Sequence, residues 1–527
     1  MKSNGWTKIL LGVALAAFST QAFATNHFWD VNGSTTGFGD YPRTGVWDNT
    51  ATNWTVVSGG NANTFAWHNN IWPTAPDGAV WRVGTTTGGS QAPAGTYTLL
   101  NPSHVVSIVG TQRVANLHAT HGAFVILTNG AVALSSASTP ISVGVTTANN
   151  TLLIFSDIQL APQSATPAAT QAFTFEAGRE YGTASESNSV NNSLIIAGKV
   201  YAVMTNATTI SLQPGKSGTG LVSKVVLLAG SEIHNGLATA FNVNVGRGQG
   251  DATVAGRIEF RGTNSYTGTT SFYGGTAVTY VDALVSQAGA FGNSSEALWM
   301  ANGDNTTATN KVELLIGAAG VTVARDINIQ RGAASNTVYG AYLGGEHTTG
   351  TSTFSGTILL ATGGTPRTTD VHLVSAAGGT VRFTGNIQDG TGGGAPINKL
   401  GLGTVELAGA NNNYRGGTKV TEGTLLVTGM LSGTNTVTVA AGATLGGTGV
   451  ITGHTTVDGT LSPGTSVGEL TFEGNLTLGG GSTSAFEING LLAGQYDQVL
   501  LSVSGKHLTY GGTLELDIWS GAQVGDF

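Results

Sequence analysis

The stretch GLGTVELAGANNNYRGGTKVTEGTLLVTG, from Gly401 to Gly429, alternates apolar residues with threonine and charged residues and is interrupted by glycine every few positions. Short runs of this kind, rich in β-branched residues and bounded by Gly or Asn, predict β-strands of about four to seven residues. Similar runs, such as FVILTNG and TVRFTGNI, recur from about residue 96 onward. No segment keeps the 3.6-residue period of an amphipathic helix, so we expect an all-β chain.

The turns near the C-terminus recur at short, regular intervals. Glycine and threonine precede Leu425, Leu445 and Leu461, which are separated by 20 (445 − 425) and 16 (461 − 445) residues. Units of this length are too short to fold alone and must stack on their neighbours to bury an apolar face. Alternation places valine and leucine on one side of each strand and threonine on the other. The pattern predicts a right-handed parallel β-helix of roughly 20 rungs.

The opening stretch has a second copy earlier in the chain. Residues 256–268 match residues 403–416 position by position, pairing Asn264 with Asn411 and Tyr266 with Tyr414. The alignment places one inserted residue directly before Tyr414. We interpret the pair as an internal repeat of the β-helix.

The longer run from Lys399 to Gly429 resembles the autotransporter-associated β-strand repeat. The residues that carry the resemblance are Lys399, Gly401, Gly403, Leu407, Gly409, Asn411, Tyr414, Gly416, Gly417, Thr418, Gly423 and Leu425. The copy at 256–278 lacks the leading lysine and has Gly268-Thr269 in place of the paired glycines. The resemblance implies a passenger-type β-helix displayed outside the cell. It implies no reaction, because such a repeat is a scaffold.

The N-terminus has the plan of a secretory signal peptide. Lys2 and Lys8 precede the apolar run ILLGVALAAF, and an A-x-A pattern predicts cleavage between Ala24 and Thr25. We expect three segments: a signal peptide (1–24), a Trp-rich head (25–95) and a β-helix (96–527). No later stretch approaches about 18 consecutive apolar residues, so no transmembrane segment is expected after signal removal. The protein should be secreted or held at the cell surface.

Composition excludes several classes of partner. The formal charge is −8 and becomes −10 (19 − 29) when the signal peptide and its two lysines are removed. So few basic residues argue against nucleic-acid binding. The chain has no cysteine, so a secreted product must rely on an extensive packed core.

The head (25–95) is rich in tryptophan. Six of the nine tryptophans in the chain lie there: Trp29, Trp47, Trp54, Trp67, Trp72 and Trp81. Large aromatic side chains can cover the open end of a stacked core. They can also stack on sugars, so Trp47 and Trp54 are candidate glycan contacts. We favour the capping role.

Candidate catalytic and metal-binding residues are sparse. His118 and His121 are three apart but sit on a predicted strand edge without a third ligand. The densest group of charged residues consists of Arg247, Asp251, Arg257, Glu259 and Arg261. The inward–outward alternation of a strand is enough to explain why charged residues occupy its outward positions, so no catalytic role is needed. Glycoside hydrolysis would need two carboxylates on adjacent rungs, and Asp370 and Glu406 are candidates for such a pair. We predict no catalytic residue, no cofactor and no metal.

We therefore expect a structural or adhesive surface protein, with extracellular glycans, matrix or other cell-surface proteins as partners. The alternatives are a polysaccharide-active lyase or hydrolase and carbohydrate binding through the tryptophans. The 63 residues (527 − 464) after Gly464 read as further passenger strands rather than as a C-terminal translocator domain. We expect the chain to be a fragment of a longer product, or to be exported without its own anchor.

Overall fold

The computed structural model describes strands and the turns between them. The residues that it describes are 26–29, 43–47, 54–55, 78–82, 104–120, 124–135, 141–143, 150–162, 170–177, 192–214, 223–246, 253–273, 278–285, 289–300, 309–330, 338–362, 369–391, 393–433, 436–490 and 492–518. Every regular element among them is a β-strand, as the sequence predicted. The predicted cleavage site and most of the Trp-rich head lie outside these residues.

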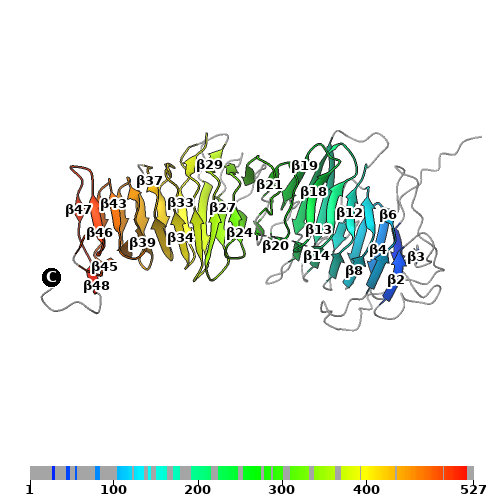
Figure 1. Cartoon of the computed structure of the whole chain (residues 1–527), viewed down its shortest axis with the longest axis horizontal. Helices are drawn as coiled ribbons and strands as arrows, with labels where there is room; N and C mark the ends of the chain where they lie inside the picture. The colour runs from blue at the N-terminus through cyan, green and yellow to red at the C-terminus, as the bar shows by residue number, and fades with distance from the viewer. Residues whose placement is uncertain are drawn as a thin grey trace, which may run out of the picture.

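The strands stack into an elongated rod whose N-terminal and C-terminal strands occupy opposite ends (Figure 1). A complete rung contributes strands to three faces, which we name A, B and C. The chain passes from face B to face C, then to face A, and returns to face B one rung further along. Neighbouring strands on a face pair in parallel, except that β1 and β3 are antiparallel, and the register shifts within the pairs β15–β18 and β26–β29. The predicted parallel β-helix is confirmed.

Face B is one continuous ladder of 17 strands in chain order. They are β2 (Arg43–Trp47), β5 (His104–Ile108), β8 (Phe124–Thr128), β11 (Asn150–Ile154), β14 (Asn192–Ile196), β17 (Ser223–Leu227), β20 (Thr253–Phe260), β22 (Val278–Val285), β24 (Thr309–Ile316), β27 (Val338–Gly345), β30 (Thr369–Ser375), β33 (Ile397–Leu400), β35 (Thr418–Val420), β38 (Val437–Val439), β41 (Thr455–Val457), β44 (Leu476–Leu478) and β47 (Leu508–Thr509).

Face C consists of two sheets separated by an interruption. The five-stranded sheet contains β6 (Thr111–Val114), β9 (Ala131–Leu134), β12 (Asp157–Leu160), β15 (Lys199–Ala202) and β18 (Glu232–Gly236). The nine-stranded sheet contains β25 (Thr322–Val323), β28 (Thr351–Phe354), β31 (Thr380–Phe383), β34 (Thr404–Leu407), β36 (Thr424–Val427), β39 (Thr444–Gly447), β42 (Thr460–Pro463), β45 (Thr483–Ile488) and β48 (Thr513–Ile518).

Face A is interrupted once as well, further along the rod. Its first sheet has 13 strands, namely β3 (Trp54–Thr55), β1 (Asn26–Trp29), β4 (Gly78–Arg82), β7 (Leu117–Thr120), β10 (Ile141–Val143), β13 (Thr170–Ala177), β16 (Ala207–Pro214), β19 (Phe241–Val245), β21 (Thr270–Phe272), β23 (Leu298–Met300), β26 (Ile327–Gln330), β29 (Ile358–Thr362) and β32 (Ile387–Asp389). A four-stranded sheet follows: β37 (Met430–Leu431), β40 (Val450–Ile451), β43 (Glu469–Phe472) and β46 (Gln498–Leu501).

The core is built from columns of inward side chains, one per rung. Val405, Leu425, Leu445 and Leu461 occupy one register position on face C and are all buried. Removing such side chains from water is the main stabilising term, at roughly 1.5–3 kcal/mol for each. In-register stacking gives every rung the same inward position, which explains the recurrent leucine in the sequence.

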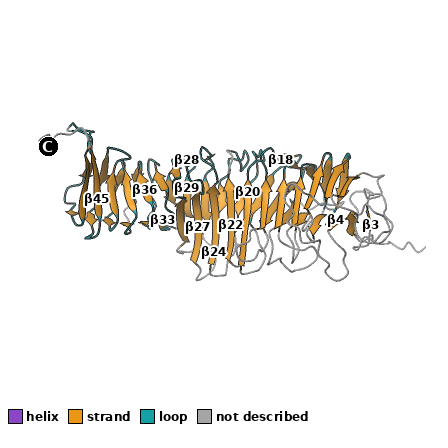
Figure 2. Ribbon diagram, turned by 90° about the horizontal axis from the view of Figure 1, so that it is seen from below, coloured by secondary structure: helices purple, strands orange, loops and turns teal. Residues whose placement is uncertain are grey.

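The rod is widest in its middle. On face B, β20, β22, β24 and β27 each have 8 residues and β30 has 7, whereas the strands from β33 onward have four or fewer. The longer strands project from one side of the rod in Figure 2.

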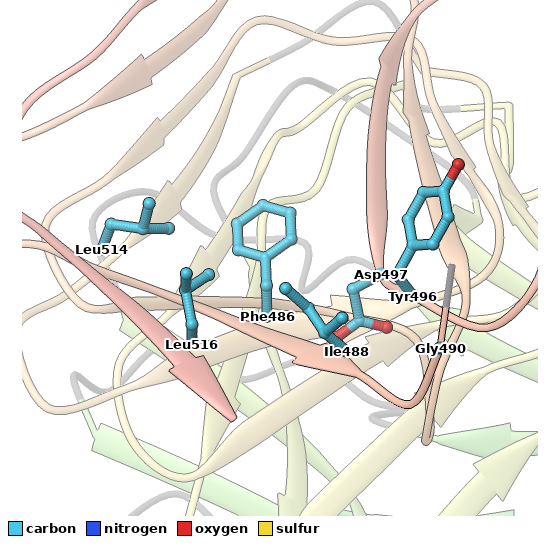
Figure 3. A pocket seen from close by; sticks show the side chains of 7 residues that line it. All are labelled: Phe486, Ile488, Gly490, Tyr496, Asp497, Leu514 and Leu516. Atoms are coloured by element: carbon cyan, nitrogen blue, oxygen red, sulfur yellow. The ribbon is translucent and has the colours of Figure 1, made fainter. Parts of the chain in front are cut away.

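The apolar interior reaches the surface at the last described rung. Leu514, Leu516 and Ile518 of β48 are exposed, although Leu514 continues the inward column of Leu461. Leu514 and Leu516, together with Phe486 and Ile488 of β45, line a hollow of about 420 Å³ (Figure 3).

Candidate functional site

The first copy of the internal repeat turns a corner on face C where no strand forms. Its Asn264 is 1% exposed and lies between two rungs. The side-chain oxygen accepts the Ile233 N–H of the preceding rung at 2.8 Å, and the side-chain nitrogen donates to the Ala290 carbonyl of the following rung. One amide thus bonds in both directions along the axis, as a strand residue would.

The second copy makes the same corner with Asn412, which is fully buried. Its oxygen accepts the Ile387 N–H at 2.9 Å, and its nitrogen donates to the carbonyls of Gly409 and Met430, both at 3.1 Å. Ile387 belongs to the preceding rung and Met430 to the following one. The buried polar groups of this corner are therefore satisfied, as a low-dielectric interior requires.

A buried tyrosine follows each asparagine by two residues. The hydroxyl of Tyr266 lies 2.7 Å from the Thr270 hydroxyl, and that of Tyr414 lies 2.7 Å from the Thr418 hydroxyl. Burial raises the pKa of both phenols well above the usual range, so each stays neutral. Each ring fills the core and its hydroxyl is paired, as buried tyrosines usually require.

The glycine two residues after each tyrosine is required by close approach. A Cβ on Gly268 would lie 2.2 Å from the Phe241 carbonyl oxygen, and one on Gly416 would lie 2.0 Å from the Ala395 carbonyl carbon. Both contacts are to backbone of the preceding rung, which cannot move aside. Of the predicted motif glycines, these are needed for space rather than for a left-handed backbone.

The structure corrects the alignment of the two copies. The residue equivalent to Asn264 is Asn412 and not Asn411, so the insertion precedes Asn412 rather than following it. Asn411 lies at the surface, where its backbone N–H bonds Asn386 and its side chain accepts from Ser432. The run of three asparagines left this choice open in the sequence, and burial decides it.

The copies also occupy different faces. In the first, the strand before the corner is β20 on face B; in the second it is β34 on face C. The corner of the first copy replaces a face-C strand between β18 and β25, and that of the second replaces a face-A strand between β32 and β37. Each copy therefore coincides with one of the sheet interruptions.

Lys399, the first residue of the predicted motif, points into the core. It occupies an inward register position between Leu373 and Val420 and is fully buried. Its ammonium donates to the carbonyl of Gly401, and to those of Gly403 at 2.7 Å and Glu422 at 2.9 Å. Burial lowers its pKa to about 8, and the Glu422 carboxylate opposes the shift. The lysine thus joins the turns of two successive rungs.

The family model for the passenger-associated-transport-repeat matches residues 255–276 and 397–427, which contain these two corners. The chain carries the passenger-associated-transport-repeat twice. The predicted resemblance to an autotransporter passenger repeat is confirmed, and the repeat family implies a secreted or cell-surface protein. Searches of the curated proteins and of the solved structures found no match to the chain.

From the first copy of the passenger-associated-transport-repeat toward the second, the outer side of face B carries charged and aromatic residues. Arg257 Nη2 lies 2.6 Å from Glu346 Oε1, and Lys311 pairs with Glu313 on the same strand. The Lys311 ammonium is 4.3 Å from the centre of the Tyr342 ring, which stacks on His372 at 4.2 Å. These six residues form what we call the face-B network.

Burial favours the neutral forms of two residues of the face-B network, Glu313 and His372, through their pKa values. Burial raises the pKa of Glu313; contact with Lys311 opposes the rise and the Glu346 carboxylate adds to it. Burial also lowers the pKa of His372, an effect that Asp370 opposes and Lys311 reinforces. The network contains two carboxylates, two cations and a neutral imidazole within one outer face.

The predicted charged group is divided between two interactions. Ile258 and Phe260 face inward as expected, but Arg257 pairs with Glu346 and Glu259 pairs with Arg261. Arg247 and Asp251 lie outside the described residues. The sequence missed Glu346 and Glu313 because they lie several rungs away from Arg257, and only stacking brings them near it.

The other predicted residues do not form a site. Asp370 is on face B and Glu406 on face C, where Glu406 bonds Arg382 at 3.2 Å, so the two carboxylates do not act together. His118 is buried in β7, and burial lowers its pKa to about 3; His121 lies outside the described residues. In the described part of the chain, no group of His, Cys, Asp and Glu is arranged to hold a metal.

Trp47 is fully buried in the core, so the structure contradicts its assignment as a glycan contact. Its burial reflects packing against the first rungs of face B. Trp54 lies in β3, but its side chain is outside the described part. None of the residues that the structure describes forms a helix able to span a membrane.

We expect Asn412→Ala to lower the free energy of unfolding by about 1–3 kcal/mol, because the buried Ile387 N–H loses its partner while the Met430 carbonyl keeps the backbone N–H of residue 412. Hydrogen exchange should show faster exchange of the Ile387 amide, and denaturant unfolding should give the energy. Asn411→Ala is the matched control at the neighbouring surface position, with an expected loss below about 1 kcal/mol. Equal losses for the two variants would contradict the role of the buried amide.

The pKa of Lys399 predicts a pH dependence of stability. The folded chain releases this proton near pH 8 and the unfolded chain near 10.5. Between these values the unfolded chain binds more protons, so stability should rise with pH across this window, by up to about 3 kcal/mol. Unfolding of the wild type and of Lys399→Met at pH 7.5 and 10 tests this, since the variant should lack this rise. An equal rise in both would contradict it.

Proposed function

We propose that this passenger-type β-helix is a rigid adhesive scaffold displayed outside the cell. The observation that supports the proposal most directly is a column of threonines on the outer side of face C. Eight successive strands place threonine at one register position: Thr351, Thr380, Thr404, Thr424, Thr444, Thr460, Thr483 and Thr513. All eight are half-buried or exposed.

Such a column presents one hydroxyl per rung, at intervals of about 4.8 Å. A hydroxyl both donates and accepts hydrogen bonds, so the row can bind polymers of varied chemistry, including glycans and matrix proteins. Each contact is weak, but many equal contacts along a rigid rod add up when the partner is also extended. The rigidity comes from the packed core beneath, where Val405 and Leu425 alternate with Thr404 and Thr424.

To test adhesion, beads bearing the purified chain are applied to surfaces coated with polysaccharide or with matrix protein. We expect the triple variant Thr404→Val, Thr424→Val and Thr444→Val to lose at least half of the bound beads, because three adjacent hydroxyls are removed while side-chain shape is kept. The matched control is the Thr→Ser triple variant at the same positions, which retains the hydroxyls. Circular dichroism should show the same strand content in all three proteins.

Two results would contradict the adhesive role. One is binding of the wild type no greater than that of uncoated beads on every surface. The other is equal binding of the valine and serine variants, which would place adhesion elsewhere on the rod.

A second function, cleavage of polysaccharide by a lyase or hydrolase, is favoured by one observation. The raised pKa of Glu313 beside a second carboxylate, Glu346, is the arrangement that general acid–base chemistry uses. If this function holds, incubation with acidic polysaccharides yields shorter products, and Glu313→Gln abolishes the turnover while Lys419→Gln does not. Absence of products from the wild type would leave adhesion as the better account.

A further inference from the structure

The dipeptide Asn-Gly can be modified in water without an enzyme. The glycine nitrogen loses its proton and attacks Cγ of the asparagine side chain, a C–N bond forms, and the amide nitrogen leaves as ammonia. Water then opens the resulting succinimide ring at either carbonyl, which gives aspartate or isoaspartate. Glycine favours the attack because it has no Cβ to restrict the backbone. In the part of the chain that the structure describes, the pair occurs at Asn129, Asn235 and Asn489.

Ring closure requires freedom in both residues of the pair. The side-chain amide has to turn toward the following nitrogen, and the glycine N–H has to be available to lose its proton. A hydrogen bond on either group therefore opposes the reaction, since it must break first. Close contact with the backbone of a neighbouring rung opposes it too, because the peptide between the two residues cannot then rotate.

Asn235 is held at both groups. Its side-chain oxygen accepts the Thr267 N–H at 2.9 Å, and its side-chain nitrogen donates to the Thr267 hydroxyl at 2.8 Å. The Gly236 N–H donates to His234 Nδ1 at 3.1 Å. A Cβ on Gly236 would lie 2.1 Å from the Ala202 carbonyl oxygen, so the preceding rung also confines this peptide. The fold protects Asn235 from ring closure.

Asn129 is held by the rung before it. Its side-chain nitrogen donates to the Ser107 hydroxyl at 2.9 Å, and its φ of 58° is in the left-handed region. A Cβ on Gly130 would lie 2.5 Å from the Gly110 carbonyl oxygen, so the turn rests directly on the backbone of that rung. This pair is therefore protected by stacking as well.

Asn489 lies outside the stack, in the connection from β45 to β46, and it is exposed. Its backbone N–H donates to the Gln495 carbonyl at 2.7 Å, and Ile488 forms an antiparallel bridge with Tyr496, so the connection is a hairpin. Among the described residues, none forms a hydrogen bond with the Asn489 side chain or with the Gly490 N–H. A Cβ on Gly490 would meet the Gln495 side chain, 2.2 Å from Oε1, and not the backbone of a rung.

We propose that Asn489 is a site of spontaneous deamidation, whereas stacking protects Asn129 and Asn235. The three pairs have the same chemistry, and the fold leaves only the hairpin pair among these three free to react. This modification is independent of the proposed adhesive function.

The product changes the C-terminal part of the rod in two ways. It adds a carboxylate beside Gly490, which lines the apolar hollow at the last described rung (Figure 3). Glu487 and Asp497 belong to the same hairpin, so the aged protein carries three carboxylates there. In the isoaspartate form the main chain also gains one carbon atom between residues 489 and 490, which lengthens the hairpin.

The test is peptide mapping by mass spectrometry of the purified chain after incubation at neutral and at mildly alkaline pH. We expect the Asn489 peptide to change from amide to acid at least about tenfold faster than the peptides of Asn129 and Asn235, whose hydrogen bonds must break first. The rate should rise with pH, because the attacking nitrogen has to lose its proton. In denaturant the three peptides should react at similar rates, since only the fold distinguishes them.

Two variants locate the reaction in the folded chain. Asn489→Gln should abolish the change at this position, because glutamine would have to close a six-membered ring, which forms much more slowly. Gly490→Ala keeps the asparagine and should slow the change severalfold, because its Cβ hinders the attack. Circular dichroism should show the same strand content in both variants and in the wild type.

Three results would overturn the proposal. The first is a change at Asn129 or Asn235 of the folded chain that is as fast as the change at Asn489. The second is an unchanged Asn489 after a time in which the denatured chain has reacted. The third is an equal rate at Asn489 in the wild type and in Gly490→Ala.

Discussion

A stacked rung is stable only when its backbone N–H and C=O groups find partners on the rungs before and after it. Parallel strands meet this requirement on face B without interruption. Among the described residues, face A lacks a strand between β32 and β37 and face C lacks strands in the two rungs between β18 and β25, and in each interruption a buried asparagine bonds to backbone groups of neighbouring rungs. An unpaired buried amide would cost roughly 1–3 kcal/mol at each such place. Each repeat copy therefore has a structural role, because its corner asparagine pairs backbone groups that a strand would otherwise pair.

The two copies bracket the widest part of the rod. The first copy contains β20, where the long face-B strands begin, and the second contains β33, where the strands become short. The face-B network extends from the first copy toward the second, across β20, β24, β27 and β30. A corner of this kind replaces a strand on one face. The cross-section of the rod can then change without leaving backbone groups unpaired.

The lysine and the two tyrosines of the repeat copies bring polar groups into the core, and these groups are hydrogen-bonded. Lys399 sits among leucine and valine positions, yet its ammonium meets three carbonyls of two adjacent turns. Tyr266 and Tyr414 likewise bring a hydroxyl into the core together with a threonine to receive it. Because such groups are tolerated only in one register, they oppose slippage of one rung against the next.

The sequence by itself determined the all-β class, the stacked rungs, the inward columns and the presence of two repeats, because strand periodicity and turn residues act locally. It placed Ile258 and Phe260 inside and Arg257 outside, but it was wrong to count Glu259 among the solvated outward charges, because that residue is only 4% exposed. Only the tertiary structure decided that Asn412 rather than Asn411 forms the corner, that the copies lie on different faces and that Trp47 is buried. It alone joined Arg257 to Glu346 and the Asn235 amide to Thr267. Paired residues on neighbouring rungs are separated by 16 (461 − 445) to 61 (104 − 43) positions in the chain, and these spacings vary, so contacts along the axis follow from stacking and not from local pattern.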